Sequence, residues 1–498
     1  MKLKAKIYTI ETGGLLIGII HINDARKLSI GALDRVKAKN GRIETVIAVD
    51  ISIPENDKCK PTEICEGEIG LFIDTAKKLN VKNGELIEIE HEPKPQELEY
   101  IKEKLDGQEL NREKIHNIIK ALINNELTEV EATYFLAGCY KNGMTLDEAQ
   151  YLTEAIVENG SRLNLKGKVL VDKHSIGGIP NNRTTPIIIP IIAAAGLTIP
   201  KTSTRSITSP SGTADVVEIF SPVSHSKEKI EQIVNKTNAC MVWGGTLDLA
   251  TADDKLIKLE RPLSLDPEGF FLASILGKKS AVKSKYVLID IPTGPEAKMK
   301  DKKKAKDLGE KFVKLGKRLG MKIKYIITDG TQPIGNGIGP ALEARDVLMV
   351  LQNDGPTDLK NKSVYMAGLI FEMVGIKRGQ EKARKILETG KAYEKFKEII
   401  KAQGGNAELK IDQIKLGEYI HNYVSTKNGK IISISNKMVN KISKIAGAPT
   451  SKGSGMYLNY KVDDKIKKGD VLFAIYSENK EELEITKKLE LEKVYTIK

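Results

Sequence analysis

The sequence is poor in cysteine, in aromatic residues and in long apolar runs, and each shortage excludes a class of protein. The four cysteines, Cys59, Cys65, Cys139 and Cys240, form no C-x-x-C pair, so their spacing indicates neither a zinc site nor a disulfide framework. No apolar run is long enough to span a bilayer, and the N-terminus lacks the pattern of a signal peptide. We therefore expect a protein of the reducing cytoplasm.

Aromatic residues make up only 5% of a chain whose formal net charge is +13, and this combination bears on nucleic-acid binding. A nucleic-acid binder more often shows a one-signed patch with interleaved aromatic residues. Here the lysines often alternate with glutamates, as in residues 391–398, which is typical of solvated helix faces. We interpret the positive surplus as attraction for anionic substrates. An RNA-binding protein stays an alternative that the net charge alone favours.

A chain of 498 residues is expected to form more than one domain. Short apolar or alternating runs within residues 1–90 predict a β-rich domain. Helical periodicity dominates residues 97–159, where 128–131 and 145–148 have the pattern of capping boxes. Apolar strand patterns further on indicate an α/β region, and the chain ends in a β-rich tail.

Two polar loops flank the apolar run from Ile187 to Ala195. The first, residues 173–178, follows a short strand pattern, and the second, residues 203–213, precedes a helical pattern over residues 214–220. A strand, a glycine turn and a helix start bring unpaired backbone N–H groups together, which favours an anion. Two such loops predict one ligand with two anionic groups, or two anionic ligands. Ordinary turns are the alternative, since glycine and serine are common in turns.

The two loops also carry the motifs of a known family. Residues 172–178, D-K-H-S-I-G-G, resemble the phosphate loop of thymidine and pyrimidine-nucleoside phosphorylases. Residues 203–218, with S-x-R followed by G-T-x-D-x-x-E, resemble the signature that follows this loop in the same family. Hydroxyl residues stand where the family usually has glycine, at positions 204, 206, 208 and 211. The run 204–209 is similar to the serine-rich loop of anthranilate phosphoribosyltransferase, an enzyme of similar fold that grips a sugar phosphate.

The resemblance covers nearly the whole chain and implies a multidomain α/β fold of the nucleoside phosphorylase type II kind. It implies a helical lobe at 96–165 and 247–285, an α/β phosphate-binding lobe at 166–246 and 286–403, and a hammerhead-like C-terminal α/β domain at 404–498. The shorter bacterial members lack a counterpart of residues 1–90, whose expected role is assembly of a homodimer or larger homo-oligomer. Two lobes imply a cleft that closes on substrate and excludes water.

A nucleoside phosphorylase frame with a sugar-phosphate loop implies phosphorolysis of nucleoside 5′-monophosphates. AMP and inorganic phosphate would give adenine and ribose 1,5-bisphosphate, and CMP and UMP are further candidate substrates. The resemblance assigns the inorganic phosphate to Lys173, Ser175, Ser203 and Thr213, because charge-assisted bonds to phosphate are strong. No cofactor and no metal are expected, since phosphate is a co-substrate and the sequence shows no carboxylate cluster that suggests a required metal.

The hydroxyl-rich second loop is expected to bind the 5′-phosphate. Arg205 offers a planar fork to phosphate, although a structural pairing with Asp215 or Glu218 is the alternative. Lys298 is a second candidate cation, with a solvated surface lysine as its alternative. The full set assigned to the nucleotide is Gly178, Thr204, Arg205, Ser206, Ile207, Thr208, Ser209, Thr213, Ser274 and Lys298.

The departing base needs a proton, which a carboxylic acid whose pKa is raised by desolvation can supply. The resemblance favours Asp266, although an Asp before Pro267 is also a common turn residue. Ser274 and Lys278 stand where the family's helix contacts a pyrimidine. The family's base-binding arginine does not align cleanly, which counts against strict pyrimidine specificity. Trp243, the only tryptophan, is interpreted as a packing residue.

Two other enzyme classes remain open from the sequence. A pyrimidine-nucleoside phosphorylase would act on uridine or thymidine and would gain nothing from a 5′-phosphate. A phosphoribosyltransferase would need Mg²⁺ and acidic ligands, for which Asp253 and Asp254 are the only weak candidates.

Overall fold

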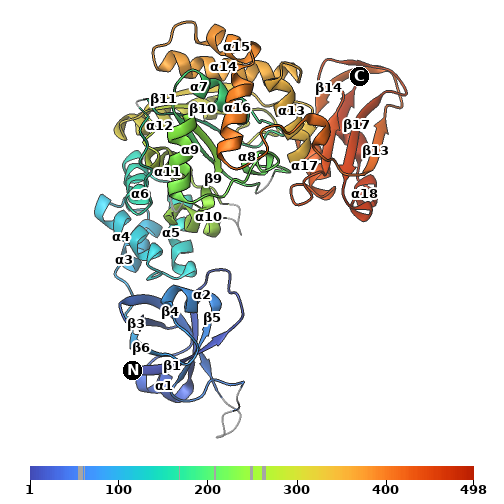
Figure 1. Ribbon diagram of the computed structural model, residues 1–498. Coiled ribbons are helices and arrows are strands. Elements are labelled where there is room, and N and C mark those ends of the chain that lie inside the picture. Colours follow the sequence, from blue (N-terminus) through green and yellow to red (C-terminus); the bar gives the residue numbers. More distant parts are fainter. Residues whose placement is uncertain (54–59, 61, 168, 207–208, 247–250, 261–264) are drawn as a thin grey trace. The chain divides into compact units, whose positions relative to one another are not determined.

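Two parts of the chain fold as separate units. The computed structural model describes residues 1–498 except 54–59, 61, 168, 207–208, 247–250 and 261–264. The first unit comprises Met1–Asn159 and Thr251–Ser274, and the second comprises Gly160–Ala250 and Ile275–Lys498. The first unit passes from strands to helices, whereas the second alternates the two and ends in a strand-rich domain (Figure 1).

The N-terminal segment is a closed barrel with strand order β1-β5-β2-β4-β3-β6. Its inward positions alternate along each strand, as the two-residue period of a β-strand requires, and side chains such as Leu3, Val36 and Leu71 are buried there. Cys65 is disulfide-bonded, which corrects the expectation drawn from the cysteine spacing. The elements are β1 (Lys2–Tyr8), β2 (Ile17–His21), α1 (Ile22–Leu28), β3 (Arg35–Asn40), β4 (Ile43–Ser52), β5 (Glu68–Phe72), α2 (Ile73–Leu79) and β6 (Leu86–His91).

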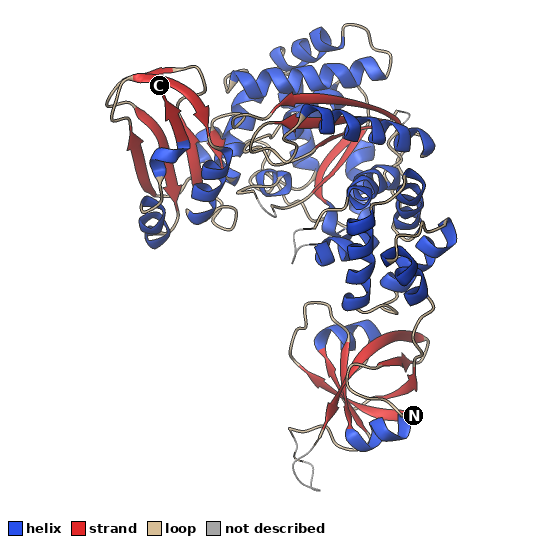
Figure 2. Ribbon diagram, turned by 180° about the vertical axis from the view of Figure 1, so that it is seen from behind, coloured by secondary structure: helices blue, strands red, loops and turns tan. Residues whose placement is uncertain are grey.

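The rest of the first unit is helical (Figure 2). Both predicted capping boxes are present: Thr128 and Glu131 cap α5, and Thr145 and Glu148 cap α6. Lys255 on α10 donates to the carbonyl oxygens at the end of α4, at 2.7 and 3.0 Å, and so binds the two helices together. The helices are α3 (Glu97–Leu105), α4 (Arg112–Ile123), α5 (Glu129–Asn142), α6 (Leu146–Glu158), α10 (Thr251–Glu260) and the first half of α11 (Glu268–Ala281).

A parallel sheet organises the second unit. β10 lies between β7 and β11, and β8 pairs with β9; a parallel bridge between Leu170 and Thr198 joins the two groups. The apolar run between the two loops forms α7, whose residues 185–193 are buried and which packs on α14 and α16. The bounds are β7 (Val171–Ser175), α7 (Thr185–Ala194), β8 (Ile199–Ser203), α8 (Thr213–Val217), α9 (Lys227–Thr237), β9 (Ala239–Trp243), β10 (Tyr286–Thr293), α12 (Lys302–Arg318), β11 (Lys322–Asp329), α13 (Pro340–Leu351), α14 (Thr357–Met373), α15 (Gly379–Glu388) and α16 (Lys391–Ala402).

The C-terminal part of this unit is built from two small sheets with a core of its own. The short strand β12 (Gly337–Ile338) leaves the α/β part and pairs with β15, so the two parts share a sheet. The remaining elements are β13 (Tyr419–Val424), β14 (Gly429–Ile434), α17 (Asn436–Ile445), β15 (Gly455–Leu458), β16 (Lys465–Ile466), β17 (Val471–Ser477), α18 (Lys480–Lys487) and β18 (Tyr495–Ile497). Within the described ranges, no helix has both the length and the apolar character needed to cross a membrane.

Candidate active site

Three loops leave the same edge of the parallel sheet. They follow β7, β8 and β10, and they contain residues 176–184, 204–212 and 294–298. Because the carboxyl ends of parallel strands meet at one edge, this is where α/β sheets bind ligands. The edge therefore gathers the described residues of both predicted phosphate loops, together with the loop of Lys298.

A buried carboxylate, Asp290, supports the first loop from the neighbouring strand. The strand register places it opposite Ser175, whose hydroxyl donates to the Asp290 carboxylate at 2.6 Å. Thr328 donates to the same carboxylate at 2.5 Å, and Lys362 of α14 forms an ion pair with it at 3.0 Å. Burial raises the pKa of Asp290, but Lys362 and the two hydroxyls outweigh burial and hold that pKa below its usual value.

Three of the described lysines on or beside strands β7 and β8 are buried. Lys173 is fully buried and its Nζ donates to Thr184 at 2.8 Å. Lys279 pairs with Asp172 at 2.7 Å, and the Nζ of Lys201 lies 3.9 Å from the other oxygen of that carboxylate. Burial lowers the pKa of Lys173 to about 7 and, reinforced by Lys279, lowers the pKa of Lys201 to about 7. A bound anion would favour the charged form of both lysines.

His174 lies between the two phosphate-loop residues Lys173 and Ser175. Burial, and then the charges of Lys279, Lys201 and other nearby lysines, hold the pKa of His174 well below its usual value. The ring is therefore neutral at physiological pH, so it is suited to hydrogen bonding.

In the second loop, Arg205 already has partners within the protein. Its guanidinium bonds Glu218 through two nitrogens, at 2.6 and 2.8 Å, and lies 3.4 Å from Asp215. The ring of Trp243 lies beneath it, 5.1 Å from the guanidinium carbon, so Trp243 is more than the packing residue that the sequence indicated. Both alternative pairings of Arg205 are thus present, although its side chain stays 37% exposed.

Several polar groups of the second loop are bonded within the loop itself. The carboxylate of Asp215 accepts from the backbone N–H groups of Ser206 and Gly212, each at 2.8 Å. The hydroxyl of Ser206 donates to the carbonyl of Ser209, and that of Ser209 donates to the carbonyl of Ser211 at 2.8 Å. The backbone N–H groups of Ser206 and Gly212 are therefore not open to an anion, contrary to what the loop pattern predicted.

The remaining residues assigned to this loop are Ser203, Thr204, Ile207, Thr208 and Thr213. Thr204 is exposed, and Thr213 is half-buried as the first residue of α8. The hydroxyl of Ser203 donates to the carbonyl of Val242 on the neighbouring strand at 3.1 Å. Ile207 and Thr208 lie outside the described residues.

Gly178 and Lys298, both assigned to the nucleotide, come together in the structure. Gly178 has a φ of +104°, and a methyl group at its α-carbon would lie 3.2 Å from the backbone nitrogen of Lys298. Only glycine fits both this backbone conformation and this approach. The first loop and the exposed side chain of Lys298 are therefore adjacent.

Asp266 and Ser274 belong to the first unit. Asp266 is exposed in the segment between α10 and α11, and Ser274 is half-buried on α11, one turn before Lys278. Asp266 lies directly before Pro267, as the turn alternative required, and its catalytic role stays a prediction.

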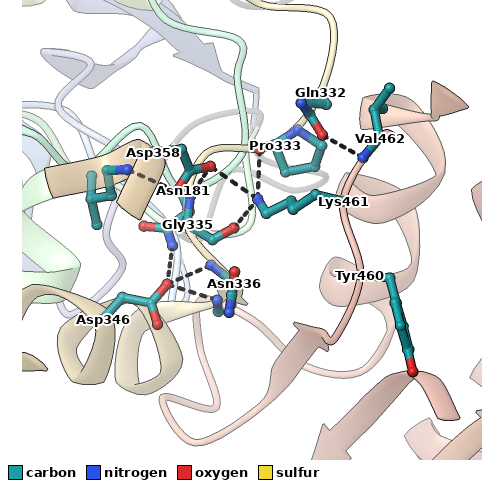
Figure 3. A network of polar contacts seen from close by, with 12 residues as sticks. Asn181, Gln332, Pro333, Gly335, Asn336, Asp346, Asp358, Tyr460, Lys461 and Val462 are labelled. Carbon is teal, nitrogen blue, oxygen red and sulfur yellow. Dashed lines mark hydrogen bonds and ion pairs between the residues drawn. The ribbon is translucent and has the colours of Figure 1, made fainter. Parts of the chain in front are cut away.

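The C-terminal domain supports the first loop through a polar network (Figure 3). Lys461 donates to the carbonyls of Pro333, at 2.9 Å, and Gly335, and pairs with Asp358 at 3.2 Å. The segment that it holds bonds the end of the first loop, because the N–H of Ile334 donates to the carbonyl of Pro180 at 3.1 Å. The buried carboxylate of Asp346 accepts from Asn181 at 2.6 Å and from the backbone N–H groups of Asn336 and Gly337.

Sequence reasoning missed the supporting residues of this edge, namely Asp290, Thr328, Lys362, Lys201 and Lys279. Asp290 carried a signal, since it is the one charged residue within the apolar run 287–292. Lys362 carried none, because it lies on α14, far along the chain from the two loop motifs.

Most of the chain is similar to known protein families. Residues 98–160 match the glycosyl transferase family helical bundle domain, 167–393 match the a/b domain of the same family, and 430–498 match the pyrimidine nucleoside phosphorylase C-terminal domain. An AMP phosphorylase of Thermococcus sibiricus is 43% identical over 96% of this chain and 94% of its own length. The AMP phosphorylase of Methanocaldococcus jannaschii is 46% identical over 86% of each chain. This chain belongs to the AMP phosphorylase family.

Membership of the AMP phosphorylase family makes the chain an enzyme of the glycosyl transferase type, and it confirms the predicted resemblance and fold class. Anthranilate phosphoribosyltransferase from Thermus thermophilus has a related fold, with a TM-score of 0.53 and 17% identity over 61% of this chain and 99% of that one. This likeness shows the fold that the serine-rich loop indicated.

The close approach of Gly178 to Lys298 leads to a prediction for this AMP phosphorylase family member. Gly178→Ala should lower the free energy of unfolding by about 1–3 kcal/mol, because the new side chain meets both an unfavourable φ and a backbone nitrogen. Gly177→Ala is the matched control. Gly177 is exposed, and no atom lies within 4 Å of the position that its added methyl would take, so its effect should stay within about 0.5 kcal/mol. Urea denaturation of the two variants measures the difference, and equal losses would contradict it.

Proposed function

We propose that this chain catalyses the phosphorolysis of AMP, with adenine and ribose 1,5-bisphosphate as products. The observation that carries the proposal is the identity of 40–46% to proteins named AMP phosphorylase, over most of the length of both chains. The gathering of both phosphate loops at one sheet edge supports it, since the reaction requires a site for two phosphoryl groups. CMP and UMP are proposed as further substrates.

In the proposed reaction, the first loop holds inorganic phosphate against C1′ of the ribose. A phosphate oxygen forms a bond to C1′ while the bond from C1′ to the base nitrogen breaks and its electron pair leaves with the base. Lys173, Ser175, Ser203 and Thr213 are the proposed ligands. The burial of Lys173 favours this role, because burial lowers its pKa and a bound anion would stabilise its charged form.

The second loop and Lys298 form the proposed binding site for the 5′-phosphate. Lys298 lies against Gly178 of the first loop, which joins the two anion sites through the backbone. Thr204, Ser206 and Ser209 add hydroxyls, and Arg205 adds the strongest charge. Because hydrogen bonds to phosphate from charged donors are about twice as strong as neutral ones, Arg205 and Lys298 would set the preference for a nucleotide over a nucleoside.

Asp266 is the proposed acid that protonates the departing adenine, and Ser274 is the proposed base contact. Both assignments come from the family resemblance of the segment that carries them. We also propose a cytoplasmic homo-oligomer that needs no metal, with the barrel serving assembly.

The central experiment measures base release by the purified protein. We expect phosphate-dependent release of adenine from AMP, little release from adenosine, and no effect of EDTA. CMP and UMP are assayed in parallel, and uridine and thymidine test for a nucleoside phosphorylase. Equal rates on nucleosides and nucleotides would replace AMP phosphorolysis with that alternative. Activity that needs Mg²⁺ and phosphoribosyl pyrophosphate would indicate a phosphoribosyltransferase.

Phosphate binding should take up a proton through Lys173. Burial lowers the pKa of this lysine to about 7, so the side chain is mostly neutral at pH 8. A bound anion raises that pKa, so Lys173 itself should take up roughly 0.9 of a proton when phosphate binds at pH 8. Phosphate affinity should accordingly weaken as pH rises above 7. Calorimetry in buffers of different ionisation enthalpy measures the uptake, and Lys173→Met, tested with enough phosphate to saturate it, should remove this proton. An unchanged uptake in the variant would exclude Lys173 as its source.

Asp266→Asn tests the proposed acid. The amide keeps the size of the side chain but has no acidic proton to give, so kcat on AMP should fall by about 10²–10⁴-fold. The dissociation constant for AMP, measured by calorimetry without phosphate, should change little. Turnover at the rate of the unmodified enzyme would remove Asp266 from the mechanism.

A further inference from the structure

The pairing of Arg205 raises a question for any role in binding phosphate. Glu218 engages both terminal nitrogens of the guanidinium, at 2.6 and 2.8 Å. If Arg205 turns to a 5′-phosphate, it leaves a carboxylate whose side chain is only 25% exposed. A partly buried carboxylate without a partner is unfavourable, so this cost would oppose substrate binding unless Glu218 keeps another cation.

The C-terminal domain supplies such a cation. Lys452 forms an ion pair with the same oxygen of Glu218 that accepts from Arg205. Its backbone is fixed independently, because the carbonyl of Lys452 accepts from the N–H of Ala341 at the start of α13, at 3.0 Å. Lys452 therefore keeps its place when Arg205 moves. Together, Arg205 and then Lys452 lower the pKa of Glu218 to about 2, so the carboxylate stays charged at working pH.

The surroundings of Arg205 also suit a change of partner. The face of Trp243 supports the guanidinium at 5.1 Å, and an aromatic face attracts a cation without fixing the direction of its N–H groups. The side chain is 37% exposed and projects from the loop that holds the predicted hydroxyl groups. The guanidinium can thus turn on the ring toward an incoming anion.

We propose that Lys452 is a positioning residue that determines specificity: it retains Glu218 when Arg205 exchanges that carboxylate for the 5′-phosphate of a nucleotide. This inference rests on the proposed function. It extends the substrate site to a residue of the C-terminal domain that touches neither the substrate nor the reacting atoms. Lys452 lowers the cost of releasing Arg205 and so favours nucleotides over nucleosides.

Steady-state kinetics on AMP and adenosine test the inference with Lys452→Met. The KM for AMP should rise about three- to tenfold, a modest change because the ion pair is partly exposed. The KM for phosphate, the kcat on AMP and the kcat/KM on adenosine should stay unchanged. Lys452→Arg should restore the KM for AMP, since it keeps the charge. Lys430→Met is the matched control, because Lys430 pairs with Asp463 inside the same domain and should affect none of these constants.

Glu218→Gln provides a second, independent measurement. Lys452 acts only through the charge of Glu218, so adding Lys452→Met to the Glu218→Gln variant should have no further effect on the KM for AMP. An unchanged KM for AMP in Lys452→Met alone would overturn the proposal. A parallel loss on AMP and adenosine, or a full effect of Lys452→Met when it is combined with Glu218→Gln, would overturn it as well, since either result means a structural or direct role.

Arg205→Ala separates this inference from the function on which it rests. If the unmodified enzyme prefers AMP over adenosine and Arg205→Ala removes the preference, the 5′-phosphate site stands and the Lys452 variants decide the inference. If the unmodified enzyme shows no such preference, the proposed function fails, and the role of Lys452 fails with it.

Discussion

Asp290 is a fully buried carboxylate, and the order of the first phosphate loop depends on how it is paired. A buried charge is tolerated only when partners surround it, and here two hydroxyls and the Lys362 ammonium do so. Because Ser175 gives its proton to Asp290 and accepts from Asn182 at 2.8 Å, its rotamer is fixed from both sides. The parallel register that sets β10 against β7 therefore orients the loop's serine before any ligand arrives.

The two proposed anion sites differ in their balance of charge. At the first site, the pKa values of Lys173 and Lys201 are lowered to about 7. Protonation of these lysines would therefore strengthen the binding of an anion. In the second, Glu218 and Asp215 already neutralise Arg205, and the pKa of Glu218 is about 2. At this second site, an anion that binds Arg205 would have to replace Glu218, which stays charged near neutral pH. Under the proposed assignments, binding of inorganic phosphate would be coupled to pH, whereas recognition of the 5′-phosphate would depend on an exchange of ion pairs.

The sequence was sufficient for the fold class and for the loop motifs, because strand, glycine and hydroxyl patterns are local. It was insufficient for contacts made between distant elements. Lys362 reaches Asp290 only because α14 packs on β10, and no spacing along the chain encodes that meeting. Arg205 shows the same limit: the sequence named Asp215 and Glu218 as possible partners, but not that both would be engaged. The strand β3 has a weak sequence pattern, because Val36 and Ala38 are its only apolar residues.

The C-terminal domain contacts the loop that carries Lys298 directly, and it contacts segments that support the other two loops. Glu296, two residues before Lys298, accepts from the Ser435 hydroxyl at 3.0 Å and from the Lys437 N–H at 2.8 Å, at the N-terminus of α17. A carboxylate is favoured at this end of a helix, so α17 fixes the loop that carries Lys298. Lys461 supports the first loop and Lys452 the second. Because separate residues of one domain hold Glu296, the segment at 333–335 and Glu218, the C-terminal domain is part of the architecture that supports the candidate site.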